Sequence, residues 1–312
     1  MPDPAKLTVG LIAGELRERA ERSLRHILSQ TAIDRLEVIV VDLNANPRKF
    51  AGSDHPRVRY LHRPNFHYYC QAQLELVRET RTSWIAFLED HCYAEPQWAE
   101  EILKAIEDPK VGALNYTFTC ATEAGYLGRA ILMAEYGYWM APHPGGSITF
   151  SASTNLAYPR ERLAAAMTSD GSIFEAEFLI HREILKEGLE IRVAPRATVG
   201  HESWSTLSGA CRANGANKRV LGSRRAETGG WGIAKRGLWA AAMVLSPGLH
   251  LARLAASVRR RPALWGTYLR SLPVLTAIYG YSACSEAAGY LFGAGGSREE
   301  FLARELAVER DA

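Results

Sequence analysis

Three side chains that can bind a metal ion, Glu89, Asp90 and His91, stand together in the sequence. They follow the apolar run 84–88, Trp-Ile-Ala-Phe-Leu, which is typical of a strand buried on both faces. Side chains alternate along an extended chain, so we expect Glu89 and His91 on one side and Asp90 on the other. A carboxylate and an imidazole on the same side can hold a divalent cation, and the cation can hold a diphosphate. Polar residues also end many strands without binding anything, and this alternative stays open here.

Strands and helices alternate around this motif. The alternation predicts an α/β architecture, a mostly parallel sheet flanked by helices. In open sheets of this kind, ligands bind outside the carboxyl ends of the strands, which is where Glu89 falls. The expected strands lie at 7–13, 36–41, 58–61, 84–88 and 111–118, and the expected helices lie at 16–29, 67–80 and 97–107.

A less regular insertion, rich in aromatic residues, glycine and proline, follows at 119–147. Strand-like composition then returns at 148–157. Helices are expected at 160–167 and 174–187, and extended segments at 189–193 and 197–199, the last of which leads to His201.

Beyond residue 205 the composition shifts. Residues 209–236 are rich in arginine, lysine, glycine and alanine, and the apolar stretches 237–258 and 270–292 are predicted to be helices. We therefore expect an α/β catalytic domain over 1–205 and a helical, partly basic and amphipathic extension over 206–312.

Composition narrows the class of protein. The chain has 312 residues, of which 47% are hydrophobic and 23% charged, as in globular proteins with a large core. A net charge of +3 argues against binding nucleic acid through the charge of the whole molecule. The five cysteines have no zinc-like spacing, and neither a signal segment nor an uninterrupted apolar run of about 18 residues is found. These features predict reduced thiols and a cytoplasmic location.

The order of these features resembles family 2 glycosyltransferases, which have the GT-A (Rossmann-like) fold. The resemblance covers about 7–204 and rests on EVIVVDLNAN, FLEDHCYAEPQW, STNLAYPRERL, FEAEFLIHREILKEG and IRVAPRATVGH. It implies an inverting enzyme that moves a sugar from a nucleotide-diphosphate sugar, most often a UDP-sugar, to an acceptor hydroxyl. It also implies a nucleotide-sugar half at about 1–118 and an acceptor half at about 119–205.

The family's metal motif is commonly Asp-x-Asp, whereas this chain has Glu89-Asp90-His91. The resemblance implies that Glu89, His91 and His201 bind a divalent cation. An imidazole suits Mn²⁺ better than Mg²⁺, and both ions stay open because the motif departs from the usual one.

The resemblance also assigns residues to the donor. Asp42, at the end of the second strand, is expected to contact the nucleobase or ribose. Its alternative role is to form a turn before Asn44. Glu15 lies in the same expected pocket, although its position also suits the first turn of a helix. The remaining expected donor contacts are Ala13, Asp90, Asn155 and Arg160.

Inverting transfer requires a carboxylate that takes the proton of the acceptor hydroxyl. The family supplies a Glu-Asp pair at the start of a helix, and this pair is missing here. Alignment favours Glu177 as the base, with Glu175 as the nearby alternative. His181 lies four residues later on the same helix face and is expected to orient Glu177. Acidic residues also stabilise the first turn of a helix without any catalytic role.

The basic segment 212–225 is predicted to close over the diphosphate, to meet lipid head groups, or to be a solvated helix. The apolar stretches after it suit a membrane surface more than a span, and packing on the catalytic domain or on a second subunit is the alternative. We therefore expect peripheral association with the inner face of the membrane and a role in cell-envelope or polysaccharide biosynthesis. The acceptor would be a glycan, a lipid-linked sugar or a small molecule.

Two other functions remain at this point. A sugar nucleotidyltransferase has a similar α/β layout but generally a glycine-rich, basic loop after the first strand, where this chain has Ala13-Gly14-Glu15. A non-catalytic sugar-nucleotide-binding partner is consistent with the unusual metal motif and the missing Glu-Asp pair.

Overall fold

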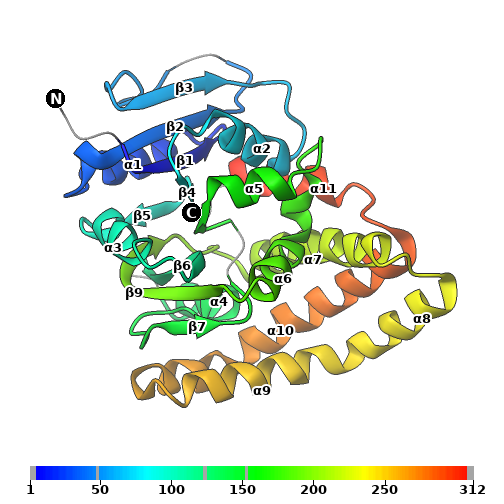
Figure 1. Cartoon of the computed structure of the whole chain (residues 1–312). Helices are drawn as coiled ribbons and strands as arrows, with labels where there is room; N and C mark the ends of the chain where they lie inside the picture. The colour runs from blue at the N-terminus through cyan, green and yellow to red at the C-terminus, as the bar shows by residue number, and fades with distance from the viewer. Residues whose placement is uncertain (1–4, 47–48, 122–124, 152–153, 308–312) are drawn as a thin grey trace. The chain divides into compact units, whose positions relative to one another are not determined.

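The computed structural model describes residues 5–46, 49–121, 125–151 and 154–307. They form two compact units, which we call the sheet unit and the helical unit (Figure 1). The sheet unit comprises the chain up to Ala121 together with Ala141–His201, and the helical unit comprises Thr122–Met140 together with Glu202–Ala312.

The expected division at residue 205 therefore needs a change, because part of the insertion 119–147 belongs to the helical unit. This part contains helix α4 (Tyr126–Tyr136), where the sequence predicted irregular structure. The apolar side chains of Ala130 and Ile131 in α4 are fully buried against Trp204, Val274 and their neighbours in the helical unit. Tertiary packing thus decides which unit this segment joins.

The first half of the sheet is parallel, as the alternation predicted. Its strands are β1 (Leu7–Ala13), β2 (Leu36–Asp42), β3 (Val58–His62) and β4 (Trp84–Glu89), in the order β3-β2-β1-β4. Every residue of β1 and β4 is buried, which explains their unbroken apolar runs.

The second half of the sheet is mixed. Strand β8 (Leu156–Pro159) is antiparallel to both β4 and β6 (Val111–Cys120), while β9 (Glu190–His201) is parallel to β6. Two short strands, β5 (Cys92–Ala94) and β7 (Gly146–Ile148), pair antiparallel with β9. Strand β5 was not predicted, since three residues carry too weak a periodic signal.

Two expected elements of this half have different bounds in the structure. The single strand expected at 148–157 corresponds to the two short strands β7 and β8. The two extended segments expected at 189–193 and 197–199 form one strand, β9, whose pairing with β6 shifts between Asn115 and Thr117. Pro195 lies within β9, and such an irregularity accommodates a residue that cannot donate a backbone hydrogen bond.

Helices flank the sheet close to their expected positions. They are α1 (Arg17–Leu28), α2 (Tyr69–Glu79), α3 (Trp98–Ala105), α5 (Arg160–Ala166) and α6 (Phe178–Lys186), with short 3-10 turns η1 (Ile33–Arg35) and η2 (Ser172–Ala176). Helix α1 buries Ala20, Leu24 and Ile27 at helical spacing, as its sequence pattern indicates.

The helical unit contains α4, α7 (Leu207–Thr228), α8 (Ile233–Ala242), η3 (Met243–Leu245), α9 (Ser246–Val258), α10 (Pro262–Phe292) and α11 (Ser297–Ala307). Helices α7 and α10 approach closely at Gly222, where an added Cβ would lie 2.5 Å from the backbone oxygen of Glu286. The apolar stretch 237–258, predicted as helix, is divided among α8, η3 and α9, and the stretch 270–292 lies within α10, which begins earlier. The basic segment 212–225 lies within α7.

Candidate active site

The carboxyl ends of three parallel strands meet at one edge of the sheet. In the strand register, Ala13 of β1 lies beside Asp42 of β2, and Ile12 lies beside Glu89 of β4. Ala13 is buried, whereas Glu15, two residues further on, is exposed. The edge therefore collects the expected nucleotide-contacting and metal-binding residues of this half, as parallel topology requires.

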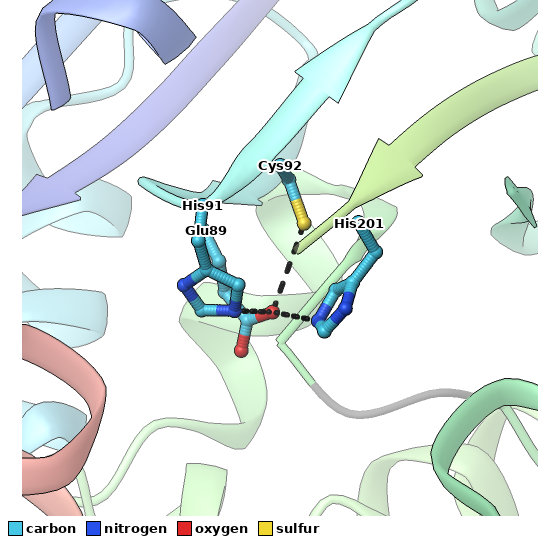
Figure 2. A group of neighbouring side chains, drawn as sticks. All are labelled: Glu89, His91, Cys92 and His201. Carbon is cyan, nitrogen blue, oxygen red and sulfur yellow. Dashed lines mark hydrogen bonds and ion pairs between the residues drawn. The ribbon is translucent and has the colours of Figure 1, made fainter. Parts of the chain in front are cut away.

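Four potential metal ligands lie together at this edge: Glu89, His91, Cys92 and His201 (Figure 2). One ligand atom from each residue lies within 4.8 Å of the others, and all four residues are buried. From Glu89 Oε2, the distance is 3.2 Å to His91 Nε2, 3.7 Å to His201 Nε2 and 3.8 Å to Cys92 Sγ. We call this group the Glu89 cluster.

Backbone geometry builds the cluster in a way that the sequence did not predict. Asp90 and His91 form a turn between β4 and β5, so the expected alternation of side chains along an extended strand is wrong. The turn nevertheless brings His91 back to Glu89. His201, the last residue of β9, is far away in the sequence. It joins the cluster because β5 pairs with β9, which places Cys92 directly opposite His201.

The cluster fits a divalent cation. Carboxylate oxygen and imidazole nitrogen are both electron-pair donors, and placing them this close is unfavourable unless protons or a metal ion offset the charge. Four ligands with bonds of about 2.0–2.3 Å in a tetrahedral arrangement stand roughly 3.3–3.7 Å apart, which is near the observed spacing. Oxygen, nitrogen and sulfur ligands favour a transition-metal ion over Mg²⁺.

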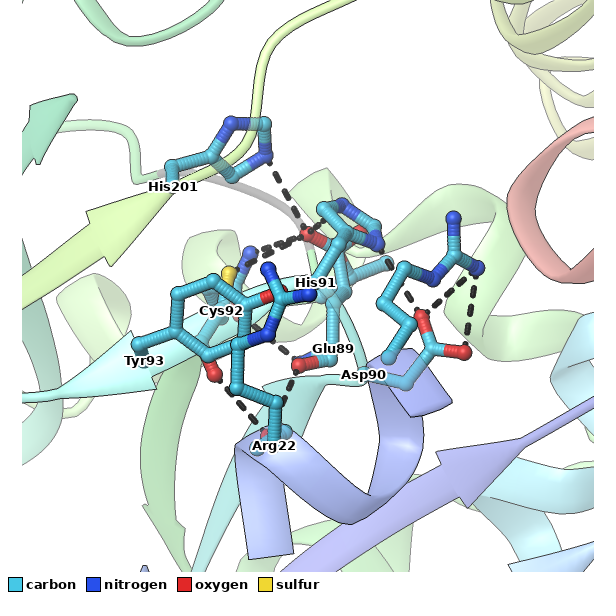
Figure 3. Close-up of polar contacts among 11 residues, drawn as sticks. Arg22, Glu89, Asp90, His91, Cys92, Tyr93 and His201 are labelled. Carbon is cyan, nitrogen blue, oxygen red and sulfur yellow. Dashed lines mark hydrogen bonds and ion pairs between the residues drawn. The ribbon is translucent and has the colours of Figure 1, made fainter. Parts of the chain in front are cut away.

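Asp90 and Arg19 support the cluster through His91, and Figure 3 shows Asp90 beside the His91 ring. The ring nitrogen Nδ1 of His91 lies 3.1 Å from Asp90 Oδ1, and Nε2 on the other side of the ring faces Glu89 Oε2 at 3.2 Å, so the ring is held between two carboxylates. Asp90 in turn forms an ion pair with Arg19 at 2.8 Å, and the two side chains are only 1% and 6% exposed. In the structure Asp90 contacts His91 and Arg19, and its expected contact with the donor stays a prediction.

Glu89 is held by two neighbouring residues. Its Oε1 accepts a 2.5 Å hydrogen bond from the Thr154 hydroxyl, and its Oε2 accepts one from the Asn155 amide. The Asn155 side-chain oxygen also accepts from the Glu89 backbone N–H over 3.1 Å. Thr154 has a φ of 69°, which is unfavourable for a β-branched residue and marks a position held by its surroundings.

The electrostatics keep Glu89 ionised. Burial alone raises the pKa of Glu89, but the neighbouring His91 and His201 outweigh this effect and hold its pKa well below the usual value. The cluster thus presents a carboxylate to an incoming cation.

Asp42 is fully buried and has several donors. Arg17 lies 2.8 Å from Oδ2, the Tyr60 hydroxyl donates to the same oxygen, and the Asn44 backbone N–H donates to Oδ1 over 3.0 Å. Burial and the hydrogen bond to Asp42 raise the pKa of Tyr60 to about 12. The turn before Asn44, the alternative role of Asp42, is therefore present.

Glu177 precedes α6 and is 5% exposed, whereas Glu175 in η2 is half-buried. Phe174 packs edge-on against Phe87 of β4, with ring centroids 5.7 Å apart. Since Phe87 and Glu89 alternate onto the same face of β4, η2 and the start of α6 lie on the face that carries Glu89. The pKa of Tyr158 is raised well above its usual value, mainly by burial and secondly by the negative charge of Glu177. The Glu177 carboxyl therefore also lies near Tyr158.

The expected pairing of His181 with Glu177 is replaced by other contacts. His181 Nε2 lies 2.7 Å from the Tyr158 hydroxyl and 2.9 Å from the Ser151 hydroxyl. Burial lowers the pKa of His181 to about 4, so the ring is neutral at physiological pH. Its backbone N–H bonds to the Glu177 carbonyl over 3.0 Å, which belongs to the start of the helix.

Arg160 does not join the site. Because β8 is antiparallel to β4, Asn155 lies beside the carboxyl end of β4 while Pro159 lies opposite Trp84 at the amino end. The Arg160 backbone N–H bonds to Ser83, before β4 begins. Five residues of chain thus separate Arg160 from Asn155, and the expected contact of Arg160 with the donor stays a prediction that this position does not support.

Sequence reasoning missed three residues of the site: Cys92, Arg19 and Thr154. Cys92 directly follows the motif and could have been found there, since a thiol is a metal ligand. Arg19 and Thr154 leave no sequence signal, because each acts through a partner distant in the chain.

Comparison with known proteins identifies the family of the chain. The sequence model of glycosyl transferase family 2 matches residues 14–169, which is half of the chain. The chain belongs to glycosyl transferase family 2. No curated protein matches this glycosyltransferase in a direct sequence comparison.

Solved structures show the same GT-A fold. The glycosyltransferase is similar to GalNAc-T7 with UDP, GalNAc and Mn²⁺, with a TM-score of 0.50 and 13% identity over 63% of this chain and 43% of that one. It therefore spans less than half the length of GalNAc-T7. It is also similar to the mannosyltransferase PcManGT from Pyrobaculum calidifontis in complex with GDP-Man and Mn²⁺. Here the TM-score is 0.55 and the identity 16%, over 92% of this chain and 87% of the other.

Proposed function

We propose that this glycosyltransferase inverts the anomeric centre as it moves a hexose from a UDP-sugar to an acceptor hydroxyl with the help of a divalent cation. The observation that carries the proposal is the buried Glu89 cluster at the carboxyl edge of the parallel strands. The two similar structures, which contain UDP or GDP-Man together with Mn²⁺, support a nucleotide-sugar donor and a metal site here.

Glu89, His91 and His201 would hold the cation, with Cys92 beside them. When bound, the ion supplies positive charge that offsets the charge on the departing nucleotide diphosphate. Asp90 fixes the His91 ring so that Nε2 faces the site, and Asn155 fixes the Glu89 carboxylate by donating to Oε2. These residues pre-organise the site so that little reorganisation is needed when the donor binds.

The nucleoside would lie against the ends of β1 and β2. Asp42 is the candidate contact for the base or ribose. Its position supports this role, because Asp42 ends β2 directly beside Ala13 at the end of β1. Because its carboxylate already accepts from Arg17 and Tyr60, a nucleoside would reach it by displacing one of these donors or by bonding to the Tyr60 hydroxyl. Glu15, exposed just beyond β1, would line the outer wall of the pocket.

Glu177 is the candidate base. Its burial and its position on the face of the sheet that carries Glu89 support this role over the more exposed Glu175. The carboxylate would accept the acceptor's proton while the hydroxyl oxygen bonds to the anomeric carbon and the bond to the diphosphate breaks. Attack from the face opposite the leaving group gives inversion.

Calorimetric titration of UDP with and without Mn²⁺ tests donor binding. We expect binding that requires the metal and is lost in His91→Ala, while His67→Ala, an exposed histidine before α2, binds as the wild type does. Metal-dependent binding of GDP in place of UDP would change the donor. If neither nucleotide binds the folded protein, the donor assignment is wrong.

Substitution of the base tests transfer. Glu177→Gln should lower kcat by about 100- to 10,000-fold while nucleotide binding is kept, and Glu175→Gln should have a much smaller effect. Equal activity of Glu177→Gln and wild type would exclude Glu177. Nucleotide binding with no sugar transfer by the wild type would favour the non-catalytic binding partner.

A further inference from the structure

The helical unit has an exposed apolar face on α8, η3 and α9. Residues 237–252 contain no lysine, arginine, aspartate or glutamate, so nothing charged interrupts the stretch. Val244 is 80% exposed and Leu245 is 72% exposed, both far above what core residues show. We call this surface the α8–α9 face, and its exposed members are Leu238, Ala241, Val244, Leu245, Gly248, Leu249 and Ala252.

The opposite side of this stretch is attached to α10 (Figure 1). Leu254 and Val258 of α9 are fully buried. The Tyr268 hydroxyl of α10 donates to the Leu251 carbonyl over 3.0 Å, and Arg236 donates to the Tyr290 carbonyl over 3.1 Å. Helix α10 in turn packs on α7, so one side of the stretch is protein and the other is open.

Basic and aromatic residues lie at the ends of the stretch. Lys235 lies over the Trp231 ring at 4.9 Å, and Trp231 stacks on Trp239 at 5.6 Å and contacts Tyr290 at 5.3 Å. Tryptophan, tyrosine and basic side chains are typical of the boundary between lipid tails and head groups. The basic residues at the other end are Arg253, Arg259 and Arg260, all exposed.

The charge pattern identifies the occupant of the face. No acidic residue occurs between Glu227 and Glu286, and Glu286 is buried against Arg225. A second copy seated on this face would bring basic ends against basic ends, which repel. Anionic lipid head groups would pair with both ends while the tails cover the apolar side chains.

We propose that the α8–α9 face rests on the surface of an anionic lipid bilayer, with the helices lying in the plane of the membrane. The segment Ile233–Val258 is long and apolar enough to cross a membrane by length and composition, and its most apolar window has a mean hydropathy of 1.3 with 11% buried. An in-plane position fits better than a span, since α10 occupies one whole side and an exposed apolar face with basic residues at both ends is typical of helices that lie in the membrane interface.

Flotation of the full-length protein with lipid vesicles tests this proposal. We expect binding to vesicles of phosphatidylcholine with phosphatidylglycerol, weaker binding to phosphatidylcholine alone, and weakening by salt. Val244→Glu with Leu245→Glu should lower binding by about tenfold or more. Leu185→Glu, one change of the same kind at an exposed leucine of α6, is the control and should bind as the wild type does.

Three results would overturn the proposal. The first is absence of binding to either vesicle, and the second is equal binding by the double glutamate variant. The third is a dimer in solution that this variant dissociates, which would assign the face to a second copy. If circular dichroism shows that the double glutamate variant is unfolded, Arg259→Gln with Arg260→Gln is tested in its place. The proposal requires that this second variant lose the preference for anionic vesicles, and an unchanged preference would overturn it. No donor is present in this assay, so its outcome is independent of the proposed transfer reaction.

Discussion

The buried pair of Arg19 and Asp90 allows the support of the Glu89 cluster to be separated from the stability of the fold. Asp90→Ala removes the acceptor of His91 Nδ1 and leaves the Arg19 guanidinium, which is 6% exposed, without its carboxylate. Removing one partner of a buried ion pair costs about 3–5 kcal/mol of unfolding free energy. Loss of an outer-shell carboxylate lowers metal affinity by about 10–100-fold, or about 1.4–2.7 kcal/mol.

A double variant distinguishes these two effects. Arg19→Leu with Asp90→Leu replaces the pair by apolar side chains, which should recover most of the lost stability because no uncompensated charge remains. Metal affinity should stay low, because His91 still has no carboxylate to orient it. Urea unfolding measures the first quantity and titration with Mn²⁺ or Co²⁺ the second.

The control is Asp54→Ala, which breaks the exposed pair with Lys49 and should cost at most about 1 kcal/mol with no change in metal affinity. The reasoning is refuted if metal affinity recovers together with stability in the double variant. In that case Asp90 acts only through the fold and not by orienting His91.

Three further predictions concern other parts of the molecule. Cys92 Sγ lies 3.8 Å from Glu89 Oε2, so bound Co²⁺ should give a thiolate-to-metal charge-transfer absorption. Cys92→Ser should abolish this absorption and the control Cys70→Ser should keep it. The same spectrum in both variants would exclude Cys92 as a ligand. Because the pKa of His181 is lowered to about 4 in the folded state, the unfolded state binds the proton first as pH falls. Wild-type stability should therefore fall by up to roughly 3 kcal/mol more than that of His181→Gln between about pH 6.5 and pH 4, and equal urea-unfolding profiles would contradict this. Gly222→Ala should lower the free energy of unfolding by about 1–3 kcal/mol, since its Cβ would lie 2.5 Å from the Glu286 carbonyl oxygen. Gly237→Ala, with open space around it, should be neutral or stabilising by up to about 1 kcal/mol. Similar melting temperatures of the two variants would show that α7 and α10 separate easily.

Part of the site follows from local sequence alone. The apolar runs of β1, β2 and β4 predict buried parallel strands, and a parallel sheet brings the residues that end these strands to one edge. Asp42 and Glu89 were placed correctly at that edge for this reason. His91 was also expected beside Glu89, although the structure achieves this through a turn and not through strand alternation.

The remaining features depend on pairings between distant segments. An apolar run does not indicate whether the neighbouring strand is parallel or antiparallel to it. Strand β8 is antiparallel to β4, and this direction places Asn155 beside Glu89 and Arg160 at the other end of β4. The same holds for β5, a strand of three residues whose pairing with β9 sets Cys92 opposite His201.

The sequence by itself determined the family, the parallel half of the sheet and the identity of most residues in the Glu89 cluster, because these depend on short-range patterns of apolar and polar side chains. Only the tertiary structure decided that Asp90 pairs with Arg19, that Cys92 joins the cluster and that α4 belongs with the C-terminal helices. The partners in each case, Asp90 with Arg19, Cys92 with His201, and α4 with the C-terminal helices, are far apart in the chain. The free energy of these contacts comes from burial and charge pairing that exist only once the strands and helices have packed.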